Sequence, residues 1–393
     1  MPTTAPFPLI TLQPVADSQN AWVALLLEGN TPLDNAILTR LLNDHPLAES
    51  LESIACIVSV DLAGMDGALT VGFPAELVKR IILRFPVSAG SDPAQHEKLT
   101  ILHAAGFALM ADGIPETGVT LHPGIHSLAI SCPGNAMPTG LGDWLRKLPG
   151  PHLALGTTKN ICPGFCKFHW LVGHHTGHTT PSPKGDPTKR GLLLKLLTLV
   201  TTDAESVEIE ALIKRDTNLS YHLLKLVNSV AFSPAKKITN FAQAIALLGR
   251  RQLQRWLQLL LYARSQGSTV ASPLMPRAAL RAGLMEGLTK RQGLSHELQD
   301  HAFMAGMFSL LDVLFGSPLA AIIEPLNLSE DVVQALTSHS GQFGTMLAAV
   351  TANEGPPSPA LADTLAAAGI THEDWAEALA EAMRWAVQIS KEA

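Results

Sequence analysis

Several features that would assign the chain to a specialised class of protein are scarce in its 393 residues. Charged residues make up 16% of the chain, and 28 Lys and Arg stand against 34 Asp and Glu. The net charge of −6 gives no general attraction for nucleic acid or anionic lipid. Four cysteines are too few for a disulfide scaffold. Apolar runs stay shorter than the ~18–20 residues of a membrane-spanning helix, and the first residues lack a signal-peptide pattern. We therefore expect a cytoplasmic protein with no nucleic-acid partner and no membrane insertion.

Aliphatic side chains, by contrast, are abundant. The chain is 47% hydrophobic but only 5% aromatic, so aliphatic burial must offset the entropy of ordering the chain. At ~100–200 residues per domain, its length predicts two domains. Residues 174–190 are dense in Gly, Pro, His and Thr without apolar periodicity, which is typical of a linker. We predict a first domain at 1–173 and a second domain at 191–393, joined by this linker.

The first domain alternates short apolar runs with stretches of helical period. The apolar runs are expected to form buried strands at 8–12, 24–27, 54–60, 81–85, 107–110, 127–130 and 152–155. Helical periodicity between them, as in 33–42 and 93–105, predicts an α/β fold with a parallel sheet, open or closed into a TIM-like barrel. Because 173 residues are fewer than the ~200–250 usual for such a barrel, we expect some of its helices to be missing.

The second domain has helical periodicity throughout. The expected helices cover 208–214, 217–227, 242–260, 301–315, 328–338, 343–353 and 373–389. Such a sequence predicts an all-α helical bundle.

Motifs within the second domain resemble the HDOD (HD-related output) domain. Ile213 to Leu219 has the pattern Ile-x-x-Asp-x-x-Leu, Leu226 to Ser229 reads Leu-Val-Asn-Ser, and Ala244 to Gly249 reads Ala-Ile-x-x-Leu-Gly. The resemblance covers roughly residues 190–389, and the tail is similar to that of HDOD proteins fused to an EAL domain. It implies an HD-like helical bundle.

The chemistry of HD phosphohydrolases is expected to be absent. The segment from Ala302 to Asp312 is similar to the one in which those enzymes carry adjacent His and Asp ligands of a metal pair. Ser309 and Leu310 stand at the matching positions, and none of the 15 histidines is followed by Asp. Asp312 remains nearby, and we interpret it as a charge on a helix surface.

The first domain is similar to an EAL domain, a family of TIM-barrel-like cyclic di-GMP phosphodiesterases. The run Leu12-Gln13-Pro14-Val15 resembles the opening strand of that family. In the following run, Ala24 stands where the resemblance implies a metal-binding glutamate, and Glu28 comes four residues later. A shift of register would be needed for Glu28 to take that place.

Other ligand positions implied by the EAL resemblance are also altered. Residues 106–113 resemble the strand that ends in an Asp-Asp pair, but Met110 and Ala111 occupy those positions and Asp112 follows. Arg84 follows an apolar run where a glutamate is expected, and Ala129 and Ser131 stand near the place of a Lys-x-Asp. Since two-metal hydrolysis needs several converging carboxylates, we predict a degenerate, inactive EAL-like domain.

Cys162, Cys166 and His169 form a weak soft-metal pattern. Thiolate and imidazole ligands recur there at short intervals, as in zinc or redox sites. The spacing is not Cys-x2-Cys, and Pro163-Gly164-Phe165 resembles a turn near the last strand of an EAL domain. We therefore favour buried cysteines that fill space and predict no metal.

Arg250, Arg251 and Arg255 form a small basic stripe on an expected helix. This stripe could contact phosphate or an acidic partner, and we keep these residues as interaction candidates. The alternative is the solvated face of an amphipathic helix.

These observations predict a non-catalytic cytoplasmic signal-transduction or scaffold protein without cofactors. It would act by binding another signalling protein, whose identity the sequence does not specify. Two alternatives remain: a cyclic di-GMP phosphodiesterase that uses Glu28 and Asp112 as relocated ligands, and a receptor that binds the nucleotide without hydrolysing it.

Overall fold

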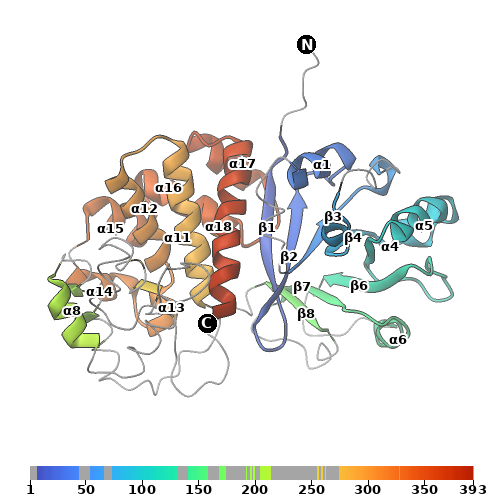
Figure 1. Ribbon diagram of the computed structural model, residues 1–393, viewed down its shortest axis with the longest axis horizontal. Coiled ribbons are helices and arrows are strands. Elements are labelled where there is room, and N and C mark those ends of the chain that lie inside the picture. The colour runs from blue at the N-terminus through green and yellow to red at the C-terminus, as the bar shows by residue number, and fades with distance from the viewer. Residues whose placement is uncertain are drawn as a thin grey trace, which may run out of the picture. The chain divides into compact units, whose positions relative to one another are not determined.

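The computed structural model contains two compact units (Figure 1). It describes residues 7–43, 54–65, 73–131, 140–157, 168–173, 204–213, 274–326 and 328–392, and isolated positions between 192 and 262. Unit 1 comprises Met1–Thr176 and Thr351–Arg384, and unit 2 comprises Gly177–Val350 and Trp385–Ala393. Unit 1 is therefore discontinuous in sequence. This differs from the expected division, which assigned 351–384 to the second domain.

The sheet of unit 1 is a closed barrel of eight strands in sequence order. The strands are β1 (Ile10–Ala16), β2 (Trp22–Gly29), β3 (Ala55–Ser59), β4 (Ile81–Pro86), β5 (Ala108–Asp112), β6 (Ile125–Ser131), β7 (Leu153–Thr157) and β8 (Trp170–Gly173). Neighbours from β2 to β8 pair in parallel, whereas β1 is antiparallel to both β2 and β8. The barrel is closed, as one of the two expected forms, but it is not the all-parallel sheet that we expected.

A tight turn explains the direction of β1. The Asp17 carboxylate accepts hydrogen bonds from the backbone N–H groups of Gln19 and Ala21, and Asn20 has a left-handed φ of 61°. A connection this short can join antiparallel strands only, because a parallel pair needs a crossover of a dozen or more residues.

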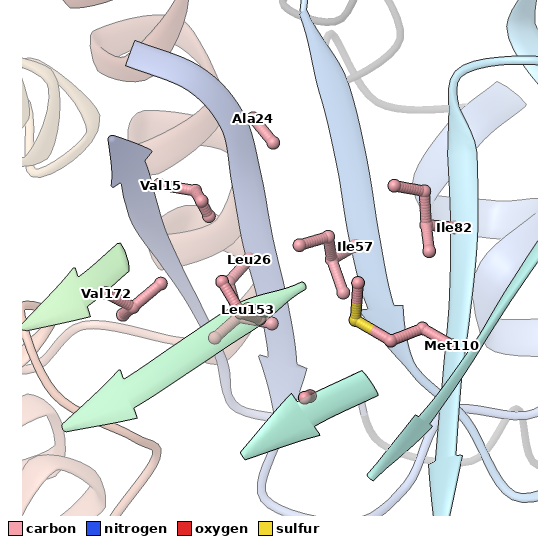
Figure 2. Packing of buried hydrophobic residues seen from close by; sticks show 9 residues of the cluster. Val15, Ala24, Leu26, Ile57, Ile82, Met110, Leu153 and Val172 are labelled. Atoms are coloured by element: carbon pink, nitrogen blue, oxygen red, sulfur yellow. The ribbon is translucent and has the colours of Figure 1, made fainter. Parts of the chain in front are cut away.

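Aliphatic side chains fill the inside of the barrel. Figure 2 shows side chains from different strands pointing into the same space, among them Leu26, Ile57 and Met110. The buried members of this barrel core are Val15, Ala24, Leu26, Ile57, Ile82, Met110, Ala129, Leu153 and Val172. Residues two positions apart on a strand point to the same face, as Ala24 and Leu26 of β2 do, and each of the other strands contributes one buried residue to this core.

Helices cover the outside of the barrel unevenly. The connections carry α1 (Asn35–Asn43), η1 (Leu62–Gly64), α3 (Ala75–Val78), α4 (Val87–Ser91), η3 (Pro93–Gln95), α5 (His96–Ala104) and α6 (Leu141–Lys147). The segment 113–124 between β5 and β6 is described throughout and contains no helix. This agrees with a barrel that lacks part of its helical ring.

Side chains of the segment 351–384 form hydrogen bonds with backbone groups on the free edge of β1. Strand β8 pairs with β1 at Ala16 alone among the described residues, so the edge at Ile10 and Leu12 has no strand beside it. Asn353 fills this role for Leu12: its Oδ1 accepts from the backbone N–H at 3.1 Å, and its Nδ2 donates to the carbonyl at 3.0 Å. The indole N–H of Trp375 donates to the carbonyl of Ile10 at 2.8 Å. Two side chains from the C-terminal region thus replace a neighbouring strand.

Two further helices belong partly or wholly to this segment. They are α17 (Pro359–Ala367) and α18 (His372–Glu392), and α18 continues from unit 1 into unit 2. Trp375 lies in the first turn of α18 and is fully buried.

Unit 2 is helical in all its described elements. They are α8 (Ser206–Ile213), α11 (Leu274–Arg291), α12 (His296–Phe308), α13 (Leu311–Phe315), α14 (Leu319–Ile323), η6 (Glu324–Leu326), α15 (Glu330–Thr337) and most of α16 (Gly341–Ala352). Helices α11 and α12 pack closely because Gly306 has no side chain: a Cβ there would lie 2.7 Å from the backbone of Ala282. The helices expected at 217–227 and 242–260 lie outside the described residues, apart from Arg255, Gln258 and Leu259.

No single helix within the described ranges is both long and apolar enough to cross a membrane. One bent pair, 296–315 with 319–326, passes the same test of length and composition when taken together.

Candidate functional site

Polar side chains gather at the carboxyl ends of β2 to β5. Glu28, Ser59, Arg84 and Asp112 each lie two residues after a member of the barrel core on the same strand. Because the side-chain repeat of a strand is two residues, all four point to the interior face. Parallel strands place their carboxyl ends at one end of a barrel, which is where barrel enzymes build their active sites. We call this group, together with Gln13 of β1, the barrel-mouth cluster.

Arg84 connects the members of this cluster. Its Nη1 donates to Glu28 Oε1 at 2.7 Å and to Ser59 Oγ at 3.1 Å. Its Nε and Nη2 donate to Asp112 Oδ2 at 3.0 and 2.5 Å. Four of the five N–H groups of the guanidinium are therefore used within the cluster. The second oxygen of Glu28 accepts from Gln13 Nε2 at 3.1 Å.

Burial strengthens these ion pairs. The Arg84 side chain is 10% exposed, and the carboxylates of Glu28 and Asp112 are 17% and 31% exposed. Charges removed from water in this way interact more strongly, and removing one partner leaves the other charge uncompensated. One cation facing two carboxylates leaves the cluster with a formal charge of −1. The cluster holds five strands of the barrel together and engages both carboxylates.

The ligand positions that we considered lost lie within apolar surroundings. Ala24, Met110 and Ala129 belong to the barrel core and are fully buried. Ala111 faces the opposite side of β5, toward α4, where a Cβ added to Gly90 would lie 3.9 Å from the Cβ of Ala111. Glu28 points to the same face as Ala24, but at ~3.3 Å per residue it is about 13 Å farther along β2. Its carboxylate therefore does not occupy the level of Ala24.

The partner of these carboxylates was not recognised from the sequence. We noted Arg84 only as a replacement for a glutamate, and we did not predict its contacts with Glu28 and Asp112. A usable signal was present: in β2, β4 and β5, one charged residue follows directly after the apolar run. Charged residues at the same end of parallel strands are expected to meet.

In unit 2, the positions that match the HD metal ligands have structural roles. Ser309 ends α12, where its hydroxyl accepts from Arg281 Nη1 at 2.9 Å and donates to the carbonyl of Gly306 at 2.7 Å. Leu310 is buried, and Asp312 lies in the first turn of α13. The phenol of Tyr262 donates to a carbonyl of α12, and burial raises its pKa.

The remaining candidates do not form a site in the described residues. Cys162 and Cys166 lie outside these residues, and His169 is exposed with its ring 6.1 Å from that of His152. In the described parts of the chain, no group of three or more His, Cys, Asp or Glu side chains could hold a metal ion.

Arg255 is not part of an open basic stripe. Its Nη2 pairs with Glu286 at 2.5 Å and Asp300 at 3.1 Å, and its guanidinium lies 4.4 Å from the ring centre of Phe303. The side chain is 17% exposed, and its charge is paired with carboxylates of unit 2. Arg250 and Arg251 lie outside the described residues, and their role as interaction candidates stays a prediction.

Comparison with known proteins identifies part of the chain. The model of the HDOD domain family matches residues 187–318, which confirms the HDOD resemblance there. The chain is 30% identical over 191 residues to the cyclic di-GMP phosphodiesterase CdgJ of Vibrio cholerae, covering 48% of this chain and 43% of that protein. It is 33% identical over 137 residues to the uncharacterized protein YuxH of Bacillus subtilis, covering 34% of this chain and 33% of that protein. The chain thus spans less than half the length of these curated relatives.

Two solved structures are also similar to the chain at low identity. An HDOD domain protein from Geobacter sulfurreducens is 16% identical, with a TM-score of 0.33, and the match covers 50% of this chain and 90% of that one. The MmoQ response regulator of Methylococcus capsulatus is 16% identical, with a TM-score of 0.23, and the match covers 51% and 99%.

Proposed function

We propose that the chain is a non-catalytic signalling protein of the cytoplasm, linked to cyclic di-GMP signalling, that acts by binding another signalling protein. The observation that carries this proposal is the position of Arg84. Its guanidinium takes the place between Glu28 and Asp112 at which a divalent cation would have to sit if these carboxylates were metal ligands.

The barrel-mouth cluster does not fit a two-metal centre. Two-metal hydrolysis of a phosphodiester requires several carboxylates that converge on the cations and a group that activates water. The cluster offers two carboxylates, and each accepts hydrogen bonds from the same guanidinium. The aliphatic side chains of the barrel core fill the space behind them. A cation entering this site would have to displace Arg84 and leave it buried without a partner, which is costly.

The HD-like positions of unit 2 support the same conclusion. Leu310 has no lone pair to donate to a cation, and the hydroxyl of Ser309 already bonds Arg281 and the backbone of Gly306. Both units thus keep packed cores where the related enzymes place metal ligands. A binding protein needs such folded surfaces and does not need reactive groups. A partner or ligand would act through this chain only by favouring one arrangement over another.

Turnover tests this proposal directly. The full chain is incubated with cyclic di-GMP and either Mg²⁺ or Mn²⁺, and the linear product pGpG is quantified by chromatography against an active phosphodiesterase. We expect no product above the rate without protein. Product that depends on the protein would overturn the proposal.

An alternative is a phosphodiesterase with relocated ligands. The name of the relative CdgJ and the location of both carboxylates at one end of the barrel favour it. It predicts that Glu28→Gln abolishes turnover, whereas Glu76→Gln does not, since Glu76 is exposed on α3 and pairs with Lys79.

A receptor without turnover would show saturable heat of binding with cyclic di-GMP in calorimetry. A protein-binding module would show neither signal.

A further inference from the structure

Four histidines lie together on the outside of the barrel, away from the barrel-mouth cluster. His96 and His103 are on α5, His122 is on the segment that leads into β6, and His126 is the second residue of β6. The ring centres of His96 and His122 are 5.3 Å apart, and those of His103 and His126 are 5.4 Å apart. Residues 96 and 103 are two helical turns apart, so both face the β6 segment. We call this group the histidine seam.

The hydrogen bonds of His122 require a neutral ring. Its Nδ1 accepts from the backbone N–H of Gly124 at 3.1 Å, and its Nε2 lies 3.0 Å from Thr100 Oγ1. The hydroxyl hydrogen of Thr100 is already donated to the carbonyl of His96 at 2.8 Å. Thr100 must therefore accept from His122, which places the ring proton on Nε2 and leaves Nδ1 as the acceptor.

A second proton on His122 would conflict with this arrangement. It would bind Nδ1 and point at the N–H group of Gly124, so an attractive contact would become a repulsive one. The segment has little room to adjust, because a Cβ at Gly124 would lie 3.0 Å from the His103 ring and 3.1 Å from His122 Nδ1. His122 itself is 6% exposed, so water cannot easily replace the lost bond.

The surroundings of His122 also disfavour a positive charge. Burial lowers its pKa, and the neighbouring His96 and His103 of α5 lower it further. The Nε2 atom of His96 is buried and has no hydrogen-bond partner. His126 faces His103 from the β6 side, and Thr100 is neutral. Among the described residues, the groups that act electrostatically on His122 are thus histidines, and they offer no negative charge that would favour a second proton on its ring.

We propose that the histidine seam is an acid-sensitive joint between α5 and β6, in which protonation of His122 releases the segment 122–126 from the helix. It is a conformational device in unit 1 that operates near neutral pH, where the charge of an ordinary histidine changes. The proposal is independent of the proposed function.

The direction of the effect follows from proton linkage. In the open state, His122 titrates near the ordinary value of 6.5, whereas the closed state resists the proton. The closed state is therefore most stable relative to the open state above this pH, and this relative stability decreases as the pH falls below it. A single histidine can change the opening equilibrium by at most about tenfold per pH unit.

Hydrogen exchange of the full chain at pH 7.5 and 5.5, corrected for intrinsic rates, tests the proposal. We expect the Gly124 amide to lose up to about tenfold in protection at the lower pH. In His122→Asn, the side-chain oxygen can still accept from Gly124 but does not titrate, so protection should be independent of pH. His296→Asn is the matched control and should behave like the unmodified chain, since His296 is exposed and lies in unit 2, outside the histidine seam.

Two results would overturn the proposal. One is an equal loss of protection in the unmodified chain and in His122→Asn. The other is an NMR titration of the His122 ring in the unmodified chain at or above the ordinary histidine value. This second measurement also decides the question if His122→Asn does not fold.

Discussion

Substitution of Asn353 by alanine tests whether the C-terminal segment is part of the barrel unit. Asn353 is 1% exposed, and its amide makes two hydrogen bonds with the backbone of Leu12. Alanine would leave one buried N–H and one buried carbonyl without partners, each at a cost of about 1–3 kcal/mol. We expect Asn353→Ala to lower the free energy of unfolding of unit 1 by about 2–6 kcal/mol. This corresponds to a change of about 30-fold to 26,000-fold in the opening equilibrium.

Hydrogen exchange during urea unfolding measures this effect at the relevant strand. Peptides that cover β1 should lose protection at lower urea in Asn353→Ala, and the Leu12 amide should be among the most affected. Gln342→Ala is a matched control, because it removes an exposed amide of the preceding helix α16 that donates to the half-buried side chain of Gln292. Such surface changes stay within about 0.5 kcal/mol.

Unchanged protection of β1 in Asn353→Ala would refute the reasoning. It would mean that the free edge of β1 does not depend on the segment 351–384. A chain ending at residue 350 would then keep a barrel of normal stability, whereas our description predicts that its β1 loses protection.

Three further predictions concern stability. Arg84→Met removes the cation that two partly buried carboxylates share, and it should destabilise unit 1 by about 3 kcal/mol in urea unfolding. This value is at the lower end of the range for buried ion pairs, because Asp112 is 31% exposed. A loss below about 0.5 kcal/mol would contradict the strength assigned to these ion pairs. His152 is buried, burial lowers its pKa, and its Nδ1 accepts a hydrogen bond from the backbone N–H of Leu128. The stability of unit 1 should therefore fall as the pH drops below the ordinary histidine pKa of 6.5. His152→Asn should weaken this pH dependence. Gly306→Ala should lower the thermal midpoint of unit 2, because its Cβ would lie 2.7 Å from the backbone of α11. The control is Gly142→Ala in α6, whose Cβ would meet no atom within 4 Å and should leave unit 1 equally stable or slightly more stable.

Local patterns in the sequence predicted most elements of the barrel. The expected strands at 81–85 and 54–60 correspond to β4 and β3, because apolar runs of this length fit strands buried on both faces. β8 was not predicted, since its four residues lie just before a Gly- and His-rich stretch and give little periodicity. The antiparallel β1 was also not predicted, although the turn residues from Asp17 to Asn20 are typical of a hairpin.

Contacts between distant residues could not be predicted from these patterns. The bonds from Arg84 to Glu28 and Asp112 join residues 56 and 28 positions apart, and those from Asn353 to Leu12 span 341 positions. Periodicity assigns a residue to a strand and a face but contains no information on which side chains meet across a closed barrel. The discontinuous unit 1 has the same cause, because its residues 351–384 follow residues 177–350 of unit 2 in sequence.

Binding of Mn²⁺ to the unmodified full chain tests the central claim most directly, since Mn²⁺ that binds protein loses its sharp signal in electron paramagnetic resonance. Our account predicts that the signal of free Mn²⁺ stays unchanged by the protein, because Arg84 already engages Glu28 and Asp112. The account would be contradicted if the unmodified chain reduced the free Mn²⁺ signal stoichiometrically and Glu28→Gln or Asp112→Asn did not.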